Sequence, residues 1–179
     1  MGIYLVSTDP ADWSDEEALR PTAVALDAEL ARLGLAPFAF APSDHGFEEK
    51  LHRPMAGFDL LCRSLTADQS PLDWDVLLPA ALPETLVLPV PSAYSDTTTV
   101  RAALPVLHGL RALAAAIELP VEHLPHAGEG LALGHWFDSP EVHRHPGRWR
   151  ADPDTAYYTA LYLRAAEHAH RTGCPMHYS

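Results

Sequence analysis

Residues 152–175 read DPDTAYYTALYLRAAEHAHRTGCP and predict the longest helix of the chain. Asp152 is one of the residue types that cap helix N-termini, and a proline such as Pro153 is favoured at the first helical position. Gly173 and Pro175 are stop signals, so about twenty helical residues lie between these boundaries. We therefore expect a chain that ends in a long C-terminal helix.

Upstream of this helix, short strands alternate with helices. Prolines punctuate most of these elements and keep the expected strands short. The order predicts a mixed α/β fold, with segregated α+β as the open alternative, in which a small sheet of three or four strands is packed by helices. In chain order we expect a strand at 3–7, a helix at 21–33, an edge strand at 35–40, helical pieces at 47–55 and 56–65, strands at 75–78 and 84–90, and a helix at 95–117.

Size and charge narrow the class of protein. The chain has 179 residues, 47% of them hydrophobic, which suits a single globular domain spanning 1–179. A net charge of −12 repels phosphate backbones and anionic lipids, so we expect neither nucleic acid nor a membrane surface as a partner. Two cysteines are too few for a disulfide framework, and the N-terminus lacks the basic region of a signal peptide. These features predict a soluble cytoplasmic protein.

Acidic residues and histidines are distributed unevenly. Residues 1–90 hold fifteen acidic and five basic side chains, whereas residues 91–179 hold nine acidic and seven basic ones together with nine of the eleven histidines. The first half therefore predicts an acidic surface, and the second half holds the groups that titrate near neutral pH. Arginine outnumbers lysine as in GC-rich bacterial genomes, a bias that also raises the histidine content, so the number of histidines alone does not indicate a metal.

The segment 135–150, HWFDSPEVHRHPGRWR, carries the densest set of chemically active side chains. His143 and His145 have the H-x-H spacing that places two imidazoles on one side of an extended segment, and His135 could complete a set of three ligands for a divalent metal. Asp138 and Glu141 are alternative third ligands. The competing interpretation is a solvated loop whose aromatic residues anchor it to the core.

The C-terminal helix carries a second set of candidates. Tyr158 and Tyr162 are four residues apart and share a face, which predicts either core packing or the lining of a pocket. His168 lies on a neighbouring face, and Arg164 is expected to pair with an acidic ligand or with an acidic side chain nearby, Glu167 or Asp154. A pocket between this helix and the 135–150 loop would bring the two sets together.

Two further segments give weaker signals. Residues 92–99 contain serine, threonine and tyrosine between a predicted strand and a predicted helix, a layout that binds anions, but the glycines of a phosphate-binding loop are missing and helix capping explains the hydroxyls. Cys174 and His177 have C-x-x-H spacing just after the helix, where the helix dipole disfavours a thiolate.

The sequence supports three hypotheses of function. The first is an acidic binding protein of the immunity, inhibitor or adaptor type, which docks a protein partner through its negative surface. The second is a small enzyme that uses a divalent metal or histidine acid–base chemistry. The third is a regulatory domain that senses pH or a ligand through the same histidines. The second hypothesis assigns catalytic roles to His135, His143, His145, Tyr158, Arg164 and His168, with His135, His143 and His145 as the metal ligands.

Overall fold

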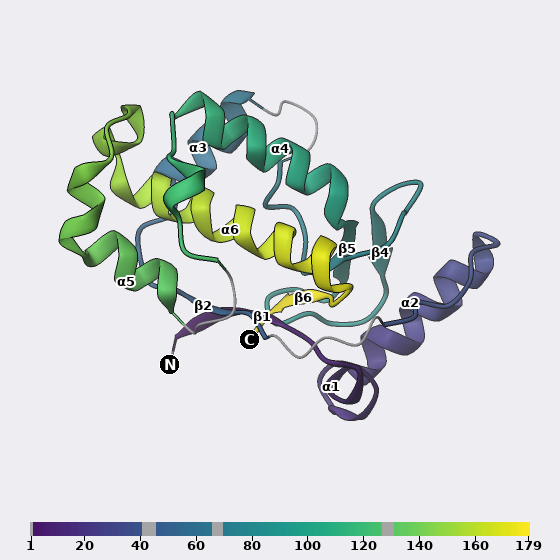
Figure 1. The fold of residues 1–179 in the computed structure, drawn as a ribbon. Helices are drawn as coiled ribbons and strands as arrows, with labels where there is room; N and C mark the ends of the chain where they lie inside the picture. Colours follow the sequence, from purple (N-terminus) through teal and green to yellow (C-terminus); the bar gives the residue numbers. More distant parts are fainter. Residues whose placement is uncertain (1, 41–45, 66–69, 127–130) are drawn as a thin grey trace.

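A mixed sheet with the strand order β2-β1-β6-β3-β5-β4 runs through the middle of the protein (Figure 1). The computed structural model describes residues 2–40, 46–65, 70–126 and 131–179, without the side chains of Glu141 and His143. Within these ranges the strands are β1 (Ile3–Ser7), β2 (Glu48–Leu51), β3 (Val76–Leu78), β4 (Leu86–Leu88), β5 (Thr98–Ala102) and β6 (Met176–Tyr178).

Helices cover the sheet on both faces (Figure 1). On one face α6 lies at the centre and contacts α3, α4 and α5, while α2 packs against α1 and β4 on the other. None of the described helices is both long and apolar enough to cross a bilayer. The helices are α1 (Pro10–Asp15), α2 (Arg20–Arg32), α3 (Ala56–Leu65), α4 (Ala103–Ala116), α5 (Ala132–Asp138) and α6 (Pro153–Thr172), with short 3-10 helices at Val121–His123, Pro140–Arg144 and Arg148–Ala151.

The strand β6 joins the two parts of the sheet. It is antiparallel to β1 on one side and to β3 on the other, so that His177 lies between Val6 and Val76. β3 and β5 are parallel, and β4, which lies between them in the sequence, pairs antiparallel with β5 at the edge. The sheet is therefore continuous only because a strand that follows α6 returns to its centre.

Alternation along β3 divides the core into two clusters. Leu77 packs with Leu5 and Met176 on the α6 face, whereas Val76 and Leu78 pack with side chains of α2 on the opposite face. Successive side chains of a strand point to opposite faces, so one strand contributes to both clusters. Burial of both faces explains why this strand reads as a continuous apolar run rather than as an alternating one.

The helix α6 begins and ends as its sequence predicts. The Asp152 carboxylate accepts hydrogen bonds from the Thr155 backbone N–H at 3.0 Å and from the Thr155 hydroxyl at 2.6 Å. Gly173 ends the helix in the left-handed conformation, with φ of 73°, where a residue without Cβ is favoured. Fourteen of its twenty residues are buried, because α6 is surrounded by the sheet and three other helices.

The predicted sheet of three or four strands is wrong, since the described residues form six. Residues 48–51, expected to be helical, form β2, and residues 98–102, expected to begin a helix, form β5. The chain also does not stop at a helix, because 176–178 form β6. Conversely, no strand is present at 35–40. In each case pairing with a distant strand, or the lack of such a partner, outweighs local propensity.

Gly57 in α3 is expected to be needed for the contact between α3 and α6. A Cβ at this position would collide with the Asp152 carboxylate and the Thr155 hydroxyl, which form the cap of α6. Gly57→Ala should therefore lower the free energy of unfolding by about 1–3 kcal/mol despite the better helix propensity of alanine. Gly109 in α4 has open space around it, so Gly109→Ala should raise that free energy by about 0.5–1 kcal/mol. Urea unfolding of both variants tests this, and stabilisation by both would contradict it.

Candidate functional site

The three histidines predicted to bind metal lie near the α5 end of the molecule. His135 is exposed on α5, and the His145 ring stacks on that of His123, with 4.1 Å between the centroids. The backbone of His143 lies in the 3-10 helix that follows α5, and its side chain is outside the described part of the structure. No group of three or more His, Cys, Asp or Glu residues among those described could hold a metal ion. The metal site stays a prediction.

Aromatic rings pack where α5 and the following residues meet α6. Phe137 contacts Tyr157 edge-to-face with the ring centroids 5.6 Å apart, and contacts Trp149 at 6.1 Å. Phe137 and Trp149 are buried, and Trp136 packs against the same cluster. The aromatic residues of the 135–150 segment therefore anchor it to the main core, as the competing interpretation proposed.

Two of the predicted catalytic residues on α6 lie inside the core. His168 is fully buried, and its ring centroid is 5.6 Å from that of Phe47. The Tyr158 hydroxyl donates to the Arg53 carbonyl oxygen at 2.6 Å and accepts from the Arg53 backbone N–H at 3.2 Å. These bonds attach α6 to the connection between β2 and α3, and none of the ring contacts of Tyr158 and His168 among the described residues involves His135 or His145.

Arg164 holds the segment that follows α4. Its guanidinium donates to the carbonyl oxygens of Pro125, Val121 and Leu124 at 3.1, 2.8 and 2.9 Å. It also donates to the Glu167 carboxylate at 2.6 Å, so Glu167 is the acidic partner among those that the sequence left open. A guanidinium with these four acceptors and little exposure fixes the 121–125 segment on α6.

Arg164→Met should lower the free energy of unfolding by about 2–4 kcal/mol, because it leaves buried carbonyl groups and the Glu167 carboxylate without their donor. Arg111→Met is the matched control: Arg111 is 57% exposed and lies 3.6 Å from the same carboxylate, so its loss should cost less than about 0.5 kcal/mol. Equal midpoints in urea for the two variants would refute a structural role for Arg164.

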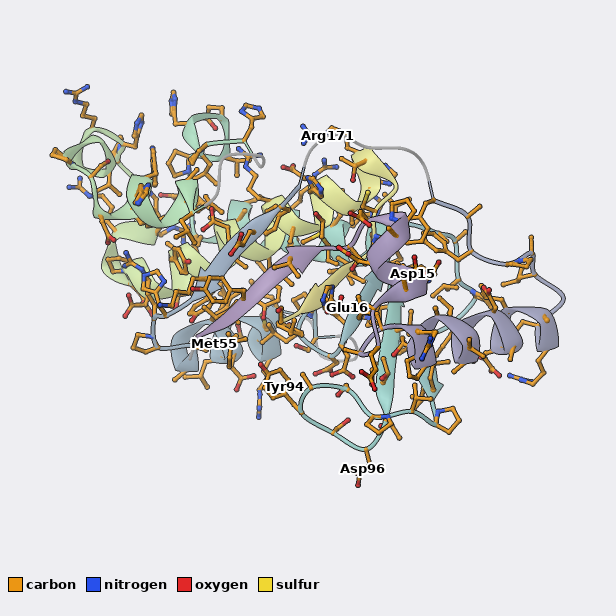
Figure 2. The ribbon with its side chains drawn as sticks, turned by 90° about the horizontal axis from the view of Figure 1, so that it is seen from below. Asp15, Glu16, Met55, Tyr94, Asp96 and Arg171 are labelled. Atoms are coloured by element: carbon orange, nitrogen blue, oxygen red, sulfur yellow. The ribbon has the colours of Figure 1, made fainter. Side chains whose placement is uncertain are left out.

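A cavity lies elsewhere, where β6 meets α2 and the β4–β5 loop. It has a volume of about 340 Å³ and is lined by residues from four separate segments. Among the lining residues, Glu16 belongs to the α1–α2 connection and Tyr94 to the β4–β5 loop, and both are labelled in Figure 2. The lining side chains that carry polar groups are Glu16, Thr22, Asp75, Ser92, Tyr94, Thr98, His177, Tyr178 and Ser179.

The cavity is acidic. Glu16 is exposed at its edge, and Asp75 precedes β3, where one carboxylate oxygen accepts from the Thr99 backbone N–H at 2.7 Å. Neither lysine nor arginine is among the described residues that line the cavity. Asp15, which precedes Glu16 in the chain, has an exposed carboxylate. Asp96 lies on the β4–β5 loop (Figure 2). Such a lining favours cationic ligands over anionic ones.

His177 adds no positive charge at neutral pH. Its Nδ1 lies 2.7 Å from the Thr8 hydroxyl oxygen. Burial lowers the pKa of His177 below the ordinary value of 6.5, and the negative charge of Asp12 opposes this effect only in part. The imidazole is therefore neutral at pH 7, and the cavity keeps the charge of its carboxylates.

Two tyrosine rings line the cavity together with aliphatic side chains such as Leu19 and Val76. The Tyr178 and Tyr162 hydroxyl oxygens are 2.8 Å apart, and burial raises the pKa of Tyr178 well above 10, so its phenol stays protonated. The Tyr94 ring lies 6.2 Å from that of Tyr178 in an edge-to-face arrangement and is 59% exposed. An aromatic surface thus stands beside the carboxylates.

Sequence reasoning identified only part of this cavity. Residues 92–99 were expected to cap a helix, but they form a loop and the start of β5, and the Ser92 hydroxyl accepts from the Ser95 backbone N–H at 3.1 Å within the loop. Glu16 and Asp75 were not identified as site residues. The acidic first half of the chain was the one signal that pointed toward them.

The stability of the protein should depend on pH through His177. Because its pKa is lowered in the folded state, the unfolded state takes up a proton first as the pH falls through about 6.5. The neutral imidazole therefore makes its full contribution to the free energy of unfolding above about pH 6.5. This contribution decreases as the pH falls from 6.5 to the lowered pKa of the folded state. The free energy of unfolding, measured in urea, should therefore fall less between pH 7.5 and 5.5 in His177→Gln than in the native chain. His108→Gln, at an exposed position of α4, should show the same fall as the native chain. The same loss in both variants would assign the effect to other groups.

Comparisons of the chain with protein-family models, with curated proteins and with solved structures found no match. Its function is therefore inferred from the geometry and charge of the chain itself.

Proposed function

We propose that the protein is a binding protein that docks a basic segment of a protein partner. The observation that carries this proposal is the cavity beside β6, which combines two carboxylates, several hydroxyls and tyrosine rings without a lysine or arginine among its described lining residues. A surface of this composition attracts lysine or arginine side chains and repels acidic ones. The proposed function is therefore recognition rather than catalysis.

The acidic surface extends beyond the cavity. Asp12, Asp15, Glu16 and Glu17 are exposed on α1 and on the connection to α2, and together we call them the acidic edge. Their field would steer a basic partner toward the cavity and raise the rate of association at low ionic strength. The cavity would then supply the short-range contacts that determine which partner stays bound.

The enzyme hypothesis has less support. Arg164 and Tyr158 are engaged in hydrogen bonds that attach segments to α6, and His168 is enclosed in the core. His135 and His145 lie at the α5 end, and none of these residues lines the cavity beside β6. The binding hypothesis requires none of these side chains to move.

Neutralising the acidic edge should weaken binding of basic peptides. A displayed library of random peptides, selected on the protein in about 50 mM salt, should return sequences rich in arginine and lysine. The triple variant Asp12→Asn, Asp15→Asn, Glu16→Gln should bind these peptides at least about tenfold more weakly, and higher salt should reduce the difference, because exposed charges are screened.

The matched control removes the same number of charges elsewhere. It carries the substitutions Asp59→Asn on α3, Glu84→Gln before β4 and Glu122→Gln in the 3-10 helix after α4. None of these residues lines the cavity. This control should bind the selected peptides within about twofold of the native chain, since only distant, screened charges have changed. Peptides without a basic bias, or equal weakening in both triple variants, would contradict the proposal.

A further inference from the structure

The cavity beside β6 has the features of a site for one planar cation. We propose that it receives the guanidinium group of an arginine side chain. This inference deepens the proposed docking function and rests on it, because the arginine belongs to the basic segment of the partner. It concerns the cavity itself, with its volume of about 340 Å³, rather than the surrounding acidic edge.

The fold brings two carboxylates to this cavity from separate elements. Glu16 comes from the α1–α2 connection and Asp75 from the residue before β3. Because the Thr99 backbone N–H binds one oxygen of Asp75 at 2.7 Å, that carboxylate is held in place and keeps its second oxygen for a further donor. A guanidinium has five N–H donors in one plane and can bind two carboxylates at once, whereas an ammonium acts as a point charge.

Thr22 provides an independent indication of a ligand. It lines the cavity from α2 and is only 4% exposed, and its hydroxyl makes no hydrogen bond with another described residue. The neighbouring Thr98, also lining the cavity, donates its hydroxyl to the Val90 carbonyl oxygen at 3.0 Å. The Thr22 hydroxyl is not among the fully buried polar atoms that lack a partner, which fits a group that faces the cavity, so it can accept a hydrogen bond from a donor that enters there.

The tyrosines favour a flat cation over a polyol or an ammonium. Tyr94 lines the cavity and is 59% exposed, and its ring centroid lies 6.2 Å from that of Tyr178. The face of a phenol ring attracts a cation, and the guanidinium plane stacks on such a ring. His177, neutral at pH 7, does not oppose the entry of a positive charge. Two carboxylates, the Thr22 hydroxyl and the exposed ring of Tyr94 together match a guanidinium in charge, hydrogen-bond acceptors and shape.

Three small ligands that differ at one group test this inference on the native chain. N-acetyl-arginine amide should bind with a dissociation constant of about 1–10 mM, as expected for one side chain without the rest of a partner. The citrulline analogue, which has the same shape without the charge, should bind at least about tenfold more weakly, and the lysine analogue at least about threefold more weakly. Titrations followed by NMR should shift the amide signals of Thr22, Thr99 and Tyr178. Equal binding of the arginine and citrulline compounds, or shifts confined to other surfaces, would overturn the inference.

Variants locate the contacts. Asp75→Asn and Thr22→Val preserve the shape of the side chains, and each should weaken binding of the arginine compound at least about threefold, because each removes one acceptor for the guanidinium. Glu84→Gln, outside the cavity, should leave binding unchanged. The comparison of arginine with citrulline needs no variant and so remains valid if one of the variants fails to fold.

The two proposals fail in different ways. If the library yields basic peptides that depend on the acidic edge, but their arginines can be replaced by lysine without loss and the cavity signals do not shift, the guanidinium site is refuted and the docking function stands. If the arginine compound binds in the cavity but no basic peptide is selected, the docking function is refuted, and with it the assignment of the arginine to a partner protein.

Discussion

Burial of the tyrosine face of α6 is the interaction on which the rest of the structure depends. Tyr157, Tyr158 and Tyr162 are each at most 1% exposed, and burial of one large side chain of this kind contributes about 1.5–3 kcal/mol. Their hydroxyls also bind three different segments: Tyr157 donates to the Lys50 carbonyl oxygen at 2.5 Å, Tyr158 to the Arg53 carbonyl oxygen, and Tyr162 pairs with Tyr178. Burial raises the pKa of all three phenols, so they stay protonated and can donate. The helix thereby fixes β2, the connection between β2 and α3, and β6 relative to one another.

This arrangement also positions the cavity. The Tyr162–Tyr178 contact holds β6 from the α6 face, and the pairing of β6 with β1 and β3 brings His177 toward Thr8. Tyr178 thus belongs both to the core and to the lining of the cavity. Changes in the packing of α6 are therefore transmitted directly to the proposed binding site.

The elements that the sequence predicted correctly are those with local signals. Asp152, Pro153 and Gly173 mark the ends of α6, and 3–7 forms β1 as expected. The strands β2 and β6 have four and three residues and depend on partners far away in the chain, so local patterns do not reveal them. For the same reason the cavity was missed, since its residues come from four segments. Arg164 was ambiguous because a local pattern cannot distinguish an arginine that binds carbonyl oxygens of its own chain from one that binds a ligand.

The central position of β6 has a consequence for how the chain assembles. β1 and β3 each need β6 as a neighbour, although β6 follows them only after α6 has been synthesised. A growing chain that has reached α6 but not β6 therefore presents two open strand edges at once. Unpaired edges are templates for association with other chains, so the interval before this last strand docks is the period of greatest risk of aggregation during synthesis.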